Sequence, residues 1–593
     1  MEEEPEERVY FPRIPLPRYP PIWSQSRQEV CESFNKFRSY QGGVYFRKDL
    51  VEGYLLGGFS SRRDIFHNGG KLIISHGGGK AESIRKTDGH FQTHEARDQL
   101  QNDKSVRALL RTYQQREPVA LLIDDKYALF PFDLTSKGCA YAVLGWYYIA
   151  HAWAEYQSAI NAQGRVVRYK FAFQWADGQG EPWWNTYLGA LGLCYRIADL
   201  IYSLVGPESP SDKYELCQTC RKSSPQVYEQ GWMCLKPECE RFWTLSDRKP
   251  APVTLSYAQS FLEPRTGFRK HTEDIRPPLP VRSDEITGPT TSWHFCKGWH
   301  CTNCGRLSSR FKWEHWECRT CGVSEHEVHI VAVSGTQRLT GNIICGGYRN
   351  FKCDMGYASH CTFILPYNRS VRTIAYIDVV WLIFLPRGRI HLLLTNPLST
   401  QDADKILTEY QEQSISGQLK FRRWPLRAVR RGILLTNYFS QNTGEPYQYV
   451  GGTDNTVSWD AAPSAVVHAL DLIKRRIEQA ELPCRADFNE VLSAAYMEKQ
   501  KMAFHSDAER GLGPNVASLS LGGSAYMYFR LHSRFAATEL SPGSSRDVLQ
   551  FYLRHGDVLV MEGADVQNHY EHTVVPTNFR VAATARYIGS EHR

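Results

Sequence analysis

Residues 503–522, AFHSDAERGLGPNVASLSLG, decide how the C-terminal third of this chain is interpreted. They contain His505 and Asp507 in an H-x-D pattern. Side chains two residues apart on a strand point to the same face, so the imidazole and the carboxylate are expected to converge. The pattern is common, and by itself it is explained by a surface histidine beside a solvated aspartate. Its interpretation as a pair of metal ligands depends on the residues that accompany it.

A second histidine is available 65 residues after Asp507. His572 lies in the segment NHYEHT (568–573), which also contains His569 as a rival. Two histidines and one carboxylate on one face of a metal leave coordination positions open, which is the arrangement of non-haem Fe(II) oxygenases. The pattern predicts such a triad from His505, Asp507 and one of the two distal histidines.

Two arginines follow in RVAATARYI (580–588), a segment that reads as a strand. Arg580 and Arg586 are six residues apart, so they share one face of a strand and lie ~20 Å apart along the backbone. Guanidinium groups bind carboxylates bidentately, and long arginine side chains reach inward. The pair therefore indicates a dicarboxylate site, against the simpler reading of two surface arginines on an edge strand.

Together these segments resemble the AlkB family of Fe(II)- and 2-oxoglutarate-dependent dioxygenases, and in particular its fungal branch with long N-terminal extensions. The likeness covers about residues 400–590. It lies in the order of the H-x-D pattern, the SLSLG strand, the HGD turn, the distal histidine and R-x5-R. The resemblance implies a C-terminal double-stranded β-helix, or jelly roll, with helices on one face. It also implies Fe(II), 2-oxoglutarate as cosubstrate, and O₂.

The resemblance also assigns the iron ligands as His505, Asp507 and His572. His572 is favoured over His569 because the family places this ligand immediately before a Thr-Val-Val-Pro stretch, as here.

The same carry-over gives roles to four further positions. Tyr496 and Arg580 match residues that hold the distal carboxylate of 2-oxoglutarate, and Arg586 matches the second arginine near the iron-side carboxylate. Glu509 matches an acidic position that faces the target base, and it is our candidate catalytic residue. Ala494 stands where the family usually has an asparagine that contacts the cosubstrate, which puts that one contact in doubt.

Eight cysteines form two clusters upstream. Their spacings are C-x2-C-x13-C-x4-C and C-x2-C-x13-C-x2-C, and Gly305 and Gly322 follow the second cysteine of a pair in the later cluster. Close pairs separated by a loop bring four thiolates to one Zn²⁺, and four closed ligands indicate a structural metal. We therefore expect two structural Zn(II) sites, against the alternative of free buried cysteines. The ligands are Cys217, Cys220, Cys234 and Cys239, and then Cys301, Cys304, Cys318 and Cys321.

Composition limits the class of protein. The chain has 593 residues, 42% hydrophobic and 22% charged, with 16 cysteines. This length suggests three to five domains with sizeable cores, and it excludes a mostly disordered chain or a small disulfide scaffold. No apolar run has the length of a membrane span, and the acidic start MEEEPEER shows no secretory signal. We expect an intracellular protein, nuclear rather than cytoplasmic, of unknown oligomeric state.

The sequence predicts an α+β multidomain protein. A Pro-rich tail (1–25) is followed by a β-rich domain (26–205), in which GWYYIAHAW and VVRYKFAFQW slightly resemble PUA/SRA-type barrels; the alternative is a scaffold for the zinc modules. Two zinc-ribbon-like modules of four cysteines each (206–330) and a strand-rich connecting region (331–395) lead to the dioxygenase domain (396–593). In that domain, apolar stripes predict a helix after Thr400 and another after Pro463.

Residues 433–460 precede the core strands and resemble the AlkB nucleotide-recognition lid. Four aromatic side chains there are candidates to stack on an extruded base, although packing on the barrel is an equal alternative: Tyr438, Tyr447, Tyr449 and Trp459. The preceding run KFRRWPLRAVRR (420–431) interleaves cations with aromatics, which suits a phosphate backbone or a solvated face. We assign Arg422 and Arg423 to nucleic-acid binding.

These observations lead to one expectation and three alternatives. We expect an oxidative demethylase of an N-methylated base in nucleic acid, with DNA favoured over RNA and N6-methyladenine as the lead substrate. The alternatives are an RNA oxygenase, a protein oxygenase, and a nucleic-acid-binding protein whose oxygenase fold has little activity.

Overall fold

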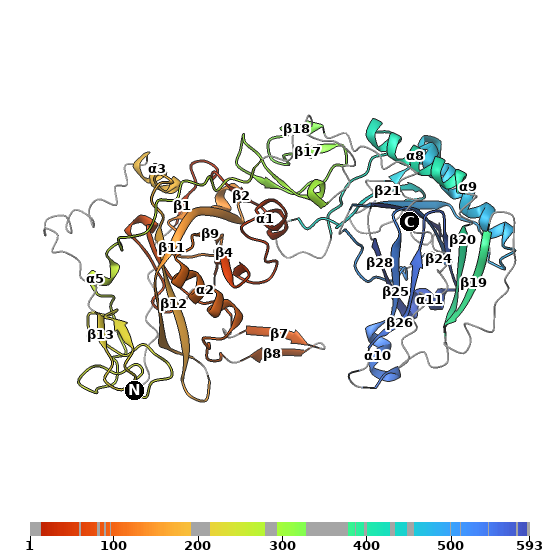
Figure 1. Cartoon of the computed structure of the whole chain (residues 1–593). Helices are drawn as coiled ribbons and strands as arrows, with labels where there is room; N and C mark the ends of the chain where they lie inside the picture. The colour runs from red at the N-terminus through yellow and green to blue at the C-terminus, as the bar shows by residue number, and fades with distance from the viewer. Residues whose placement is uncertain are drawn as a thin grey trace. The chain divides into compact units, whose positions relative to one another are not determined.

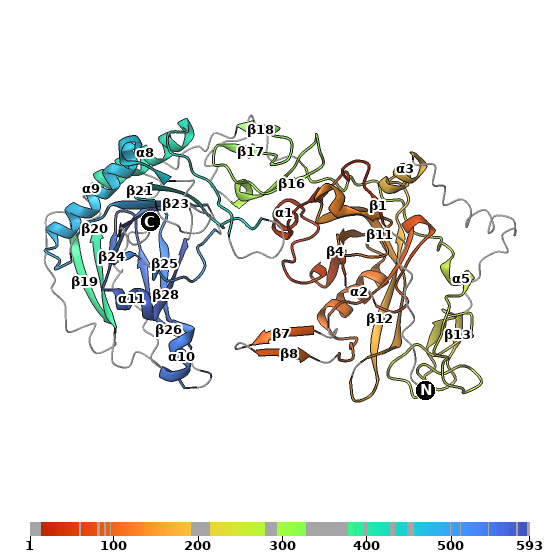
Figure 2. The same ribbon diagram turned by 180° about the vertical axis from the view of Figure 1, so that it is seen from behind.

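A computed structural model shows two compact units, one of residues 1–278 and 300–308 and the other of residues 279–299 and 309–593 (Figures 1 and 2). In the part of the chain described, no helix is long and apolar enough to cross a membrane. The structure describes residues 13–58, 61–79, 83–87, 90–94, 96–159, 161–190, 214–278, 293–327, 377–385, 387–395, 400–426, 433–446, 456–484, 486–497, 500–509, 511–541, 543, 545–576 and 579–589.

The first unit contains an eight-stranded sheet whose centre is one long hairpin. Strands β11 (Tyr141–Ser158) and β12 (Arg165–Trp175) are rich in aromatic and β-branched residues, and nearly all their side chains are buried. Side chains on both faces of these strands therefore pack against other elements. Along the sheet the strands are β3 (Val44–Arg47), β4 (Leu50–Leu56), β9 (Val119–Asp124), β11, β12, β6 (Leu72–His76) and β5 (Ile65–His67), with β2 (Trp23–Ser24) paired to β11.

The N-terminal tail predicted for residues 1–25 is in part a packed element. Strand β1 (Ile14–Pro15) pairs with β10 (Phe132–Asp133), and β2 joins the sheet. Trp23 is 1% exposed and Leu16 is 3% exposed. Burial of these apolar side chains outweighs the tendency of the surrounding prolines to keep the segment extended in solvent. Residues 1–12 lie outside the described part of the chain.

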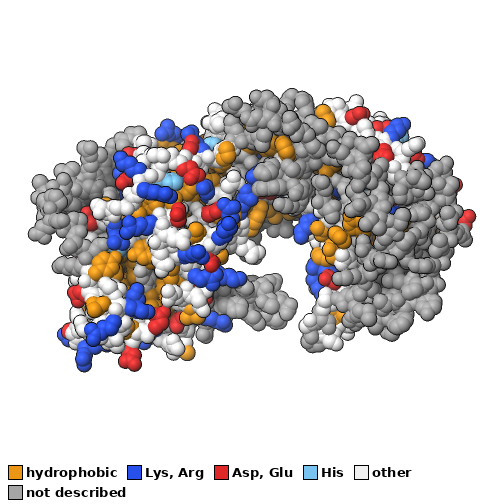
Figure 3. All heavy atoms as spheres, viewed as in Figure 1, with side chains coloured by type: hydrophobic (Ala, Val, Ile, Leu, Met, Phe, Trp, Pro, Cys, Tyr) orange, Lys and Arg blue, Asp and Glu red, His pale blue; other side chains and the backbone are white. Residues whose placement is uncertain are grey.

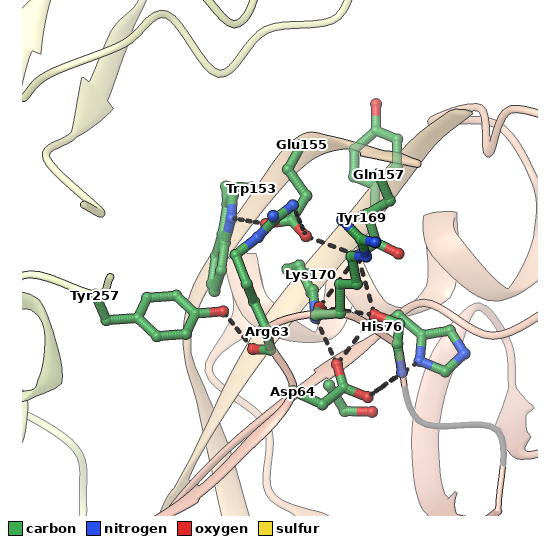
Figure 4. A network of polar contacts seen from close by, with 12 residues as sticks. Arg63, Asp64, His76, Trp153, Glu155, Gln157, Tyr169, Lys170 and Tyr257 are labelled. Carbon is green, nitrogen blue, oxygen red and sulfur yellow. Dashed lines mark hydrogen bonds and ion pairs between the residues drawn. The ribbon is translucent and has the colours of Figure 1, made fainter. Parts of the chain in front are cut away.

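The segment that carries the first cysteine cluster packs on the sheet of the first unit. Its side chains Tyr228 and Phe261 share one apolar cluster with Ile74 of β6 and Trp153 of β11. A buried polar network fixes the same contact (Figure 4), in which the Tyr257 hydroxyl donates to the Arg63 carbonyl at 2.6 Å. This cysteine module is therefore part of the first unit.

The second unit is a sandwich of two sheets, as expected for an oxygenase jelly roll. Ile390, Met527, Phe551 and Leu559 belong to one apolar cluster that lies between the sheets. The larger sheet has the order β19 (Ile377–Leu385), β20 (Gly388–Thr395), β27 (Val558–Glu562), β24 (Leu512–Gly522), β29 (Arg580–Ile588), β23 (Glu490–Tyr496), β21 (Phe439–Gly444) and β22 (Thr456–Val457). The smaller sheet has the order β26 (Asp547–Leu553), β25 (Ala525–Leu531) and β28 (Tyr570–Pro576).

Two long helices cover the outer side of the larger sheet (Figure 1). Helix α8 (Gln401–Ser416) buries Ile406, Leu407 and Tyr410, and the Tyr410 hydroxyl lies 2.8 Å from Ser493 Oγ on β23. Helix α9 (Ser464–Gln479) begins after Pro463 and buries Val466, Leu470, Ile473 and Ile477. Both apolar stripes predicted from the sequence therefore face the sheet.

The boundary predicted at residue 396 differs from the strand order. Strands β19 and β20 fall in the predicted connecting region, yet they form one edge of the larger sheet, where β20 pairs with β27. The sequence of this hairpin indicates strands, but the partner that completes its hydrogen bonds lies more than 160 residues later in the chain.

Candidate active site

The three predicted ligands converge in the second unit. His572 lies on β28, and its backbone exchanges two hydrogen bonds with that of His505, at 3.0 and 2.7 Å. Asp507 places one carboxylate oxygen 3.9 Å from His505 Nε2 and the other 3.7 Å from His572 Nε2. One ligand atom from each of the three residues lies within 4.8 Å of the others. Two imidazoles and one carboxylate at this spacing are able to hold one metal ion from one side.

The backbone that achieves this differs from the prediction. We expected the H-x-D pattern on a regular strand, but only His505 forms a bridge, and residues 506–509 are irregular. The two side chains converge because the backbone bridge to His572 fixes His505 and the following loop turns the Asp507 side chain inward to 5% exposure.

The charges in the triad favour metal binding. Burial by itself raises the pKa of Asp507, but the electrostatic effects of the neighbouring His572, His505 and Arg586 outweigh it, so this pKa lies below its ordinary value. Burial lowers the pKa of His572 to about 3. A carboxylate and a neutral imidazole are the protonation states that ligate a metal. The rival His569 stacks on Phe535, with ring centroids 4.2 Å apart, and is not in the ligand group.

The triad opens into a cavity between the two sheets. The space open to water-sized molecules inside it is about 60 Å³. Apolar side chains of Leu492, Met527, Met561 and Val574 form much of its wall. Its polar lining consists of Tyr496, His505, Asp507, Ser518, His572, Arg580, Thr584 and Arg586. The predicted cosubstrate residues therefore face the same space as the predicted iron ligands.

Arg580 carries a buried positive charge that none of the described acidic side chains neutralises. It is 2% exposed, its Nη2 donates to Ser520 Oγ at 2.8 Å, and its ring neighbour is Tyr496. Its Nε has no hydrogen-bond partner, and none of the described carboxylates pairs with it. Burial lowers its pKa to about 10, which leaves it charged at neutral pH. An unpaired guanidinium at the wall of a cavity is suited to a carboxylate ligand, so these residues fit 2-oxoglutarate.

Arg586 has a partner that the sequence reading missed. Its Nε and Nη2 each lie 2.8 Å from a carboxylate oxygen of Glu490. Glu490 and Arg586 are register partners on β23 and β29, and both are at most 1% exposed. A signal for this pair exists in the sequence, because Glu490 shares the alternating face of Leu492, Ala494 and Tyr496.

The predicted base-stacking residues are only partly described. Tyr438 is 5% exposed and packs beside Tyr496 and Ala494, with the tyrosine ring centroids 5.5 Å apart. Trp459 donates from Nε1 to the Asn489 carbonyl at 2.9 Å and does not line the cavity. Tyr447 and Tyr449 lie outside the described residues. Stacking on a base stays a prediction for all four aromatics.

Glu509, the candidate catalytic residue, follows the triad loop and is half-buried. Its Oε2 is buried and has no hydrogen-bond partner among the described residues, and the side chain does not line the cavity. Its role toward a substrate stays a prediction.

Arg422 and Arg423 are held by protein contacts. Arg422 Nη1 lies 2.9 and 2.6 Å from the two carboxylate oxygens of Glu314. Arg423 is 3% exposed and donates to the carbonyls of Thr436 and Arg310. Phosphate binding by these two side chains stays a prediction, and it requires both to leave their present partners.

Both cysteine clusters have the geometry of a closed metal site. In each, the four sulfurs lie within 4.8 Å of one another, and in the first cluster Cys217–Cys239 and Cys220–Cys234 are 3.8 Å apart. Four sulfurs bound about 2.3 Å from one zinc in a tetrahedron lie about 3.8 Å from each other. Gly305 and Gly322 adopt positive φ angles of 76° and 69° and donate to the carbonyls of Cys301 and Cys318, as tight knuckles require.

Comparison with known proteins agrees with the site in the second unit. Residues 391–587 match the model of the 2OG-Fe(II) oxygenase superfamily. The chain therefore carries a 2OG-Fe(II) oxygenase domain, and this family uses Fe(II), 2-oxoglutarate and O₂. No curated protein matches the chain.

Solved structures similar to this chain include two of the SUVH5 SRA domain with different DNAs. One is in complex with methylated CHH DNA, with 19% identity over 29% of this chain and 99% of that chain. The other is bound to fully hydroxymethylated CG DNA, with 20% identity over 29% of this chain and 100% of that chain. Both TM-scores are 0.19, which is too low to establish a shared fold.

Proposed function

We propose that this protein is a 2-oxoglutarate-dependent dioxygenase that removes the methyl group from an N-methylated base in nucleic acid, with N6-methyladenine in DNA as substrate. The observation that carries the proposal is the convergence on one cavity of the His505, Asp507 and His572 triad and the uncompensated Arg580. The oxygenase needs a metal site and a carboxylate anchor in one enclosure, and the triad and Arg580 are candidates for these two parts.

In this proposal the chain binds, orients and shields the reactants. His505, Asp507 and His572 hold Fe(II), which with 2-oxoglutarate and O₂ supplies the oxidation of the methyl group when bound. Arg580, Ser520 and Tyr496 hold the distal carboxylate of the cosubstrate. The apolar wall keeps water from the metal, and orientation and shielding are the protein's contribution in such chemistry.

The substrate approaches from the side of His505. The His505 side chain is 23% exposed, whereas those of His572 and Asp507 are 8% and 6% exposed. Arg530 lies over the Phe504 ring, 3.8 Å from the ring centroid, and its Nε donates to Glu571 at 2.7 Å. In this proposal a flat base extruded from a strand enters edge-on beside His505, the most exposed of the three ligands.

The nucleic-acid part of the proposal is supported by the AlkB-like order of motifs between residues 400 and 590 and by the net charge of +7. Demethylation of an N-methyl group by hydroxylation releases formaldehyde and the free base, with succinate and CO₂ as co-products.

The test is to incubate the full-length protein with Fe(II), 2-oxoglutarate and O₂ and one of several oligonucleotides, and to weigh the products. The set contains N6-methyladenine in DNA and in RNA, other N-methylated bases, and unmethylated strands, with Asp507→Ala as the inactive control. Loss of 14 Da from methylated DNA alone supports the proposal. Product from RNA alone moves the substrate to RNA. Succinate without any change in nucleic acid refutes the proposed substrate.

A further inference from the structure

The two arginines of β29 differ in their partners. Both are buried and both line the cavity. Arg586 forms a two-pronged ion pair with Glu490, whereas Arg580 contacts the Ser520 hydroxyl and the Tyr496 ring, and its Nε has no hydrogen-bond partner among the described residues. One end of the cavity is therefore neutral as a pair, and the other end carries a net positive charge.

The placement of Glu490 ties it to the site. Leu492, Ala494 and Tyr496 line the cavity, and Glu490 precedes them on the same alternating face of β23. It is 0% exposed, and register pairing with Arg586 holds the two side chains opposite each other. A buried carboxylate is costly unless a cation compensates it, so its presence here calls for a role.

We infer that Glu490 is a positioning and specificity residue that neutralises Arg586, so that Arg580 is the one arginine of β29 left to bind the distal carboxylate of the cosubstrate. This inference rests on the proposed oxygenase function. A dicarboxylate brought between two uncompensated arginines has two ways to bind. With Glu490 in place it has one, in which the distal carboxylate lies at Arg580 and the other end of the molecule lies toward the triad.

Glu490 also limits which ligands bind. Succinate has two carboxylates but lacks the oxo group that, with its neighbouring carboxylate, chelates a metal. It therefore gains from a second free arginine, whereas 2-oxoglutarate does not need one. Neutralising Arg586 weakens the binding of succinate relative to that of 2-oxoglutarate. This favours release of succinate, the co-product, after the reaction.

The experiment measures the affinity of the full-length protein for 2-oxoglutarate and for succinate by calorimetry, with Mn(II) replacing Fe(II) so that no turnover occurs. We expect Glu490→Gln to bind succinate about tenfold more tightly, because a freed guanidinium forms a charge-assisted hydrogen bond with a carboxylate. The ratio of 2-oxoglutarate affinity to succinate affinity therefore falls in this variant. A merely structural role for Glu490 weakens both ligands together and leaves the ratio unchanged.

The matched control is Glu562→Gln. Glu562 pairs with His391 and Arg389 in the same sheet and does not line the cavity. The Glu562→Gln variant should keep the wild-type ratio of 2-oxoglutarate to succinate affinity.

A second variant covers the case in which an unpaired Arg586 prevents folding. Replacing Glu490 by Leu and Arg586 by Met removes both charges at similar volume. This double variant should keep the preference for 2-oxoglutarate, since Arg580 is untouched. Loss of 2-oxoglutarate binding as severe as in Arg580→Met would show that Arg586 is an anchor and overturn the inference. If the wild type binds 2-oxoglutarate but Glu490→Gln has the same ratio of 2-oxoglutarate to succinate affinity as the wild type, the inference is overturned and the proposed function is not. Wild-type protein that binds no 2-oxoglutarate overturns the proposed function as well.

Discussion

Both units bury several charged side chains, but they differ in whether each buried cation described has an acidic partner. In the first unit, Lys170 Nζ lies 2.5 Å from Asp64 Oδ1, and Arg63 Nη2 lies 3.0 Å from Glu155 Oε1 (Figure 4). Glu155 also accepts from Gln157 at 2.6 Å and from the Tyr228 hydroxyl. Every cation in this network has its own anion.

The second unit balances Arg586 with Glu490 but leaves Arg580 without an acid among the described residues. A buried charge that is paired within the protein stabilises a fold at best weakly, while an unpaired one costs free energy until a ligand arrives. The difference separates a scaffold from a binding site. We therefore expect mutations in the paired network of the first unit to lower stability without changing ligand affinity. Mutation of Arg580 should lower ligand affinity without lowering stability.

Exposed charges of the first unit do not change this comparison of buried ones. Lysine and arginine side chains are scattered over the described surface of the first unit (Figure 3). Those on helix α2 (Lys104–Gln115) illustrate the pattern, because Arg107 and Arg111 both face Asp49, at 2.8 and 3.8 Å. Exposed pairs of this kind contribute little.

The largest effect is expected at the triad. Asp507→Ala and His572→Ala should lower turnover at least about 1,000-fold, because each removes a metal ligand from a set of three. The fold should persist, since the sandwich core does not depend on these side chains. His569→Ala is the matched control and should stay active, because His569 packs on Phe535. Succinate release is the measurement, and a dead His569→Ala beside an active His572→Ala would refute the ligand assignment.

The next effect concerns the complete network. Glu155→Gln or Lys170→Met leaves a buried partner charge unpaired, which typically costs about 3–5 kcal/mol. The midpoint of denaturant unfolding of the first unit should fall accordingly, while the affinity for 2-oxoglutarate should not change. Arg107→Gln, which breaks an exposed pair, serves as the control and should shift the midpoint little. Equal stability of Lys170→Met and the wild type would contradict the scaffold role.

The candidate site was in part predictable from the sequence, whereas the pairing of buried charges was not, and the reasons are physical. The cysteine clusters were predicted because ligand chemistry demands residue types at fixed spacings, whereas His505, Asp507 and His572 were assigned through the order of motifs that the chain shares with the AlkB family. Glu490 was missed because its partner lies 96 residues away along the chain and only strand pairing brings them together. The packed segment around Trp23 and the hairpin β19–β20 were missed for the same reason, since burial and edge pairing depend on remote elements.

Arg580→Met should separate binding from stability. We expect the affinity for 2-oxoglutarate to fall about 100-fold, since two charge-assisted hydrogen bonds are lost, while thermal stability stays level or rises because an unpaired buried cation is removed. The measurements are calorimetry with Mn(II) and thermal unfolding of the same sample. A clear drop in stability together with unchanged affinity would place Arg580 in the scaffold class instead.

The cysteine clusters should hold about two zinc ions per chain, because closed thiolate sites bind zinc as part of folding. Elemental analysis of protein purified without added metal is the measurement. Cys301→Ser should lower solubility or thermal stability more than it changes 2-oxoglutarate affinity. Cys484→Ser is the control, because Cys484 is buried outside both clusters. Protein free of zinc yet fully stable would refute the structural role.

The smallest effect tests a third kind of buried group, one that avoids charge altogether. His151 on β11 is 2% exposed, stacks near Phe261 with centroids 4.3 Å apart, and has no hydrogen-bond partner on either ring nitrogen among the described residues. Burial, aided by Arg265, lowers its pKa to about 3, below the ordinary value of 6.5.

Because the folded pKa is depressed, the unfolded chain takes up the proton first as pH falls. The stability that neutral His151 contributes is therefore complete above about pH 6.5 and is lost progressively between there and about pH 3. His151→Phe keeps the ring and removes the titration, so it should lose about 1 kcal/mol less than the wild type between pH 7.5 and 5.5. Denaturant unfolding of both proteins at matched pH is the measurement, and the difference between them cancels any shared loss of zinc. If the stabilities of the wild type and His151→Phe change in parallel with pH, His151 finds a partner when it is protonated. The first unit would then accommodate a further buried cation beyond the network of Figure 4.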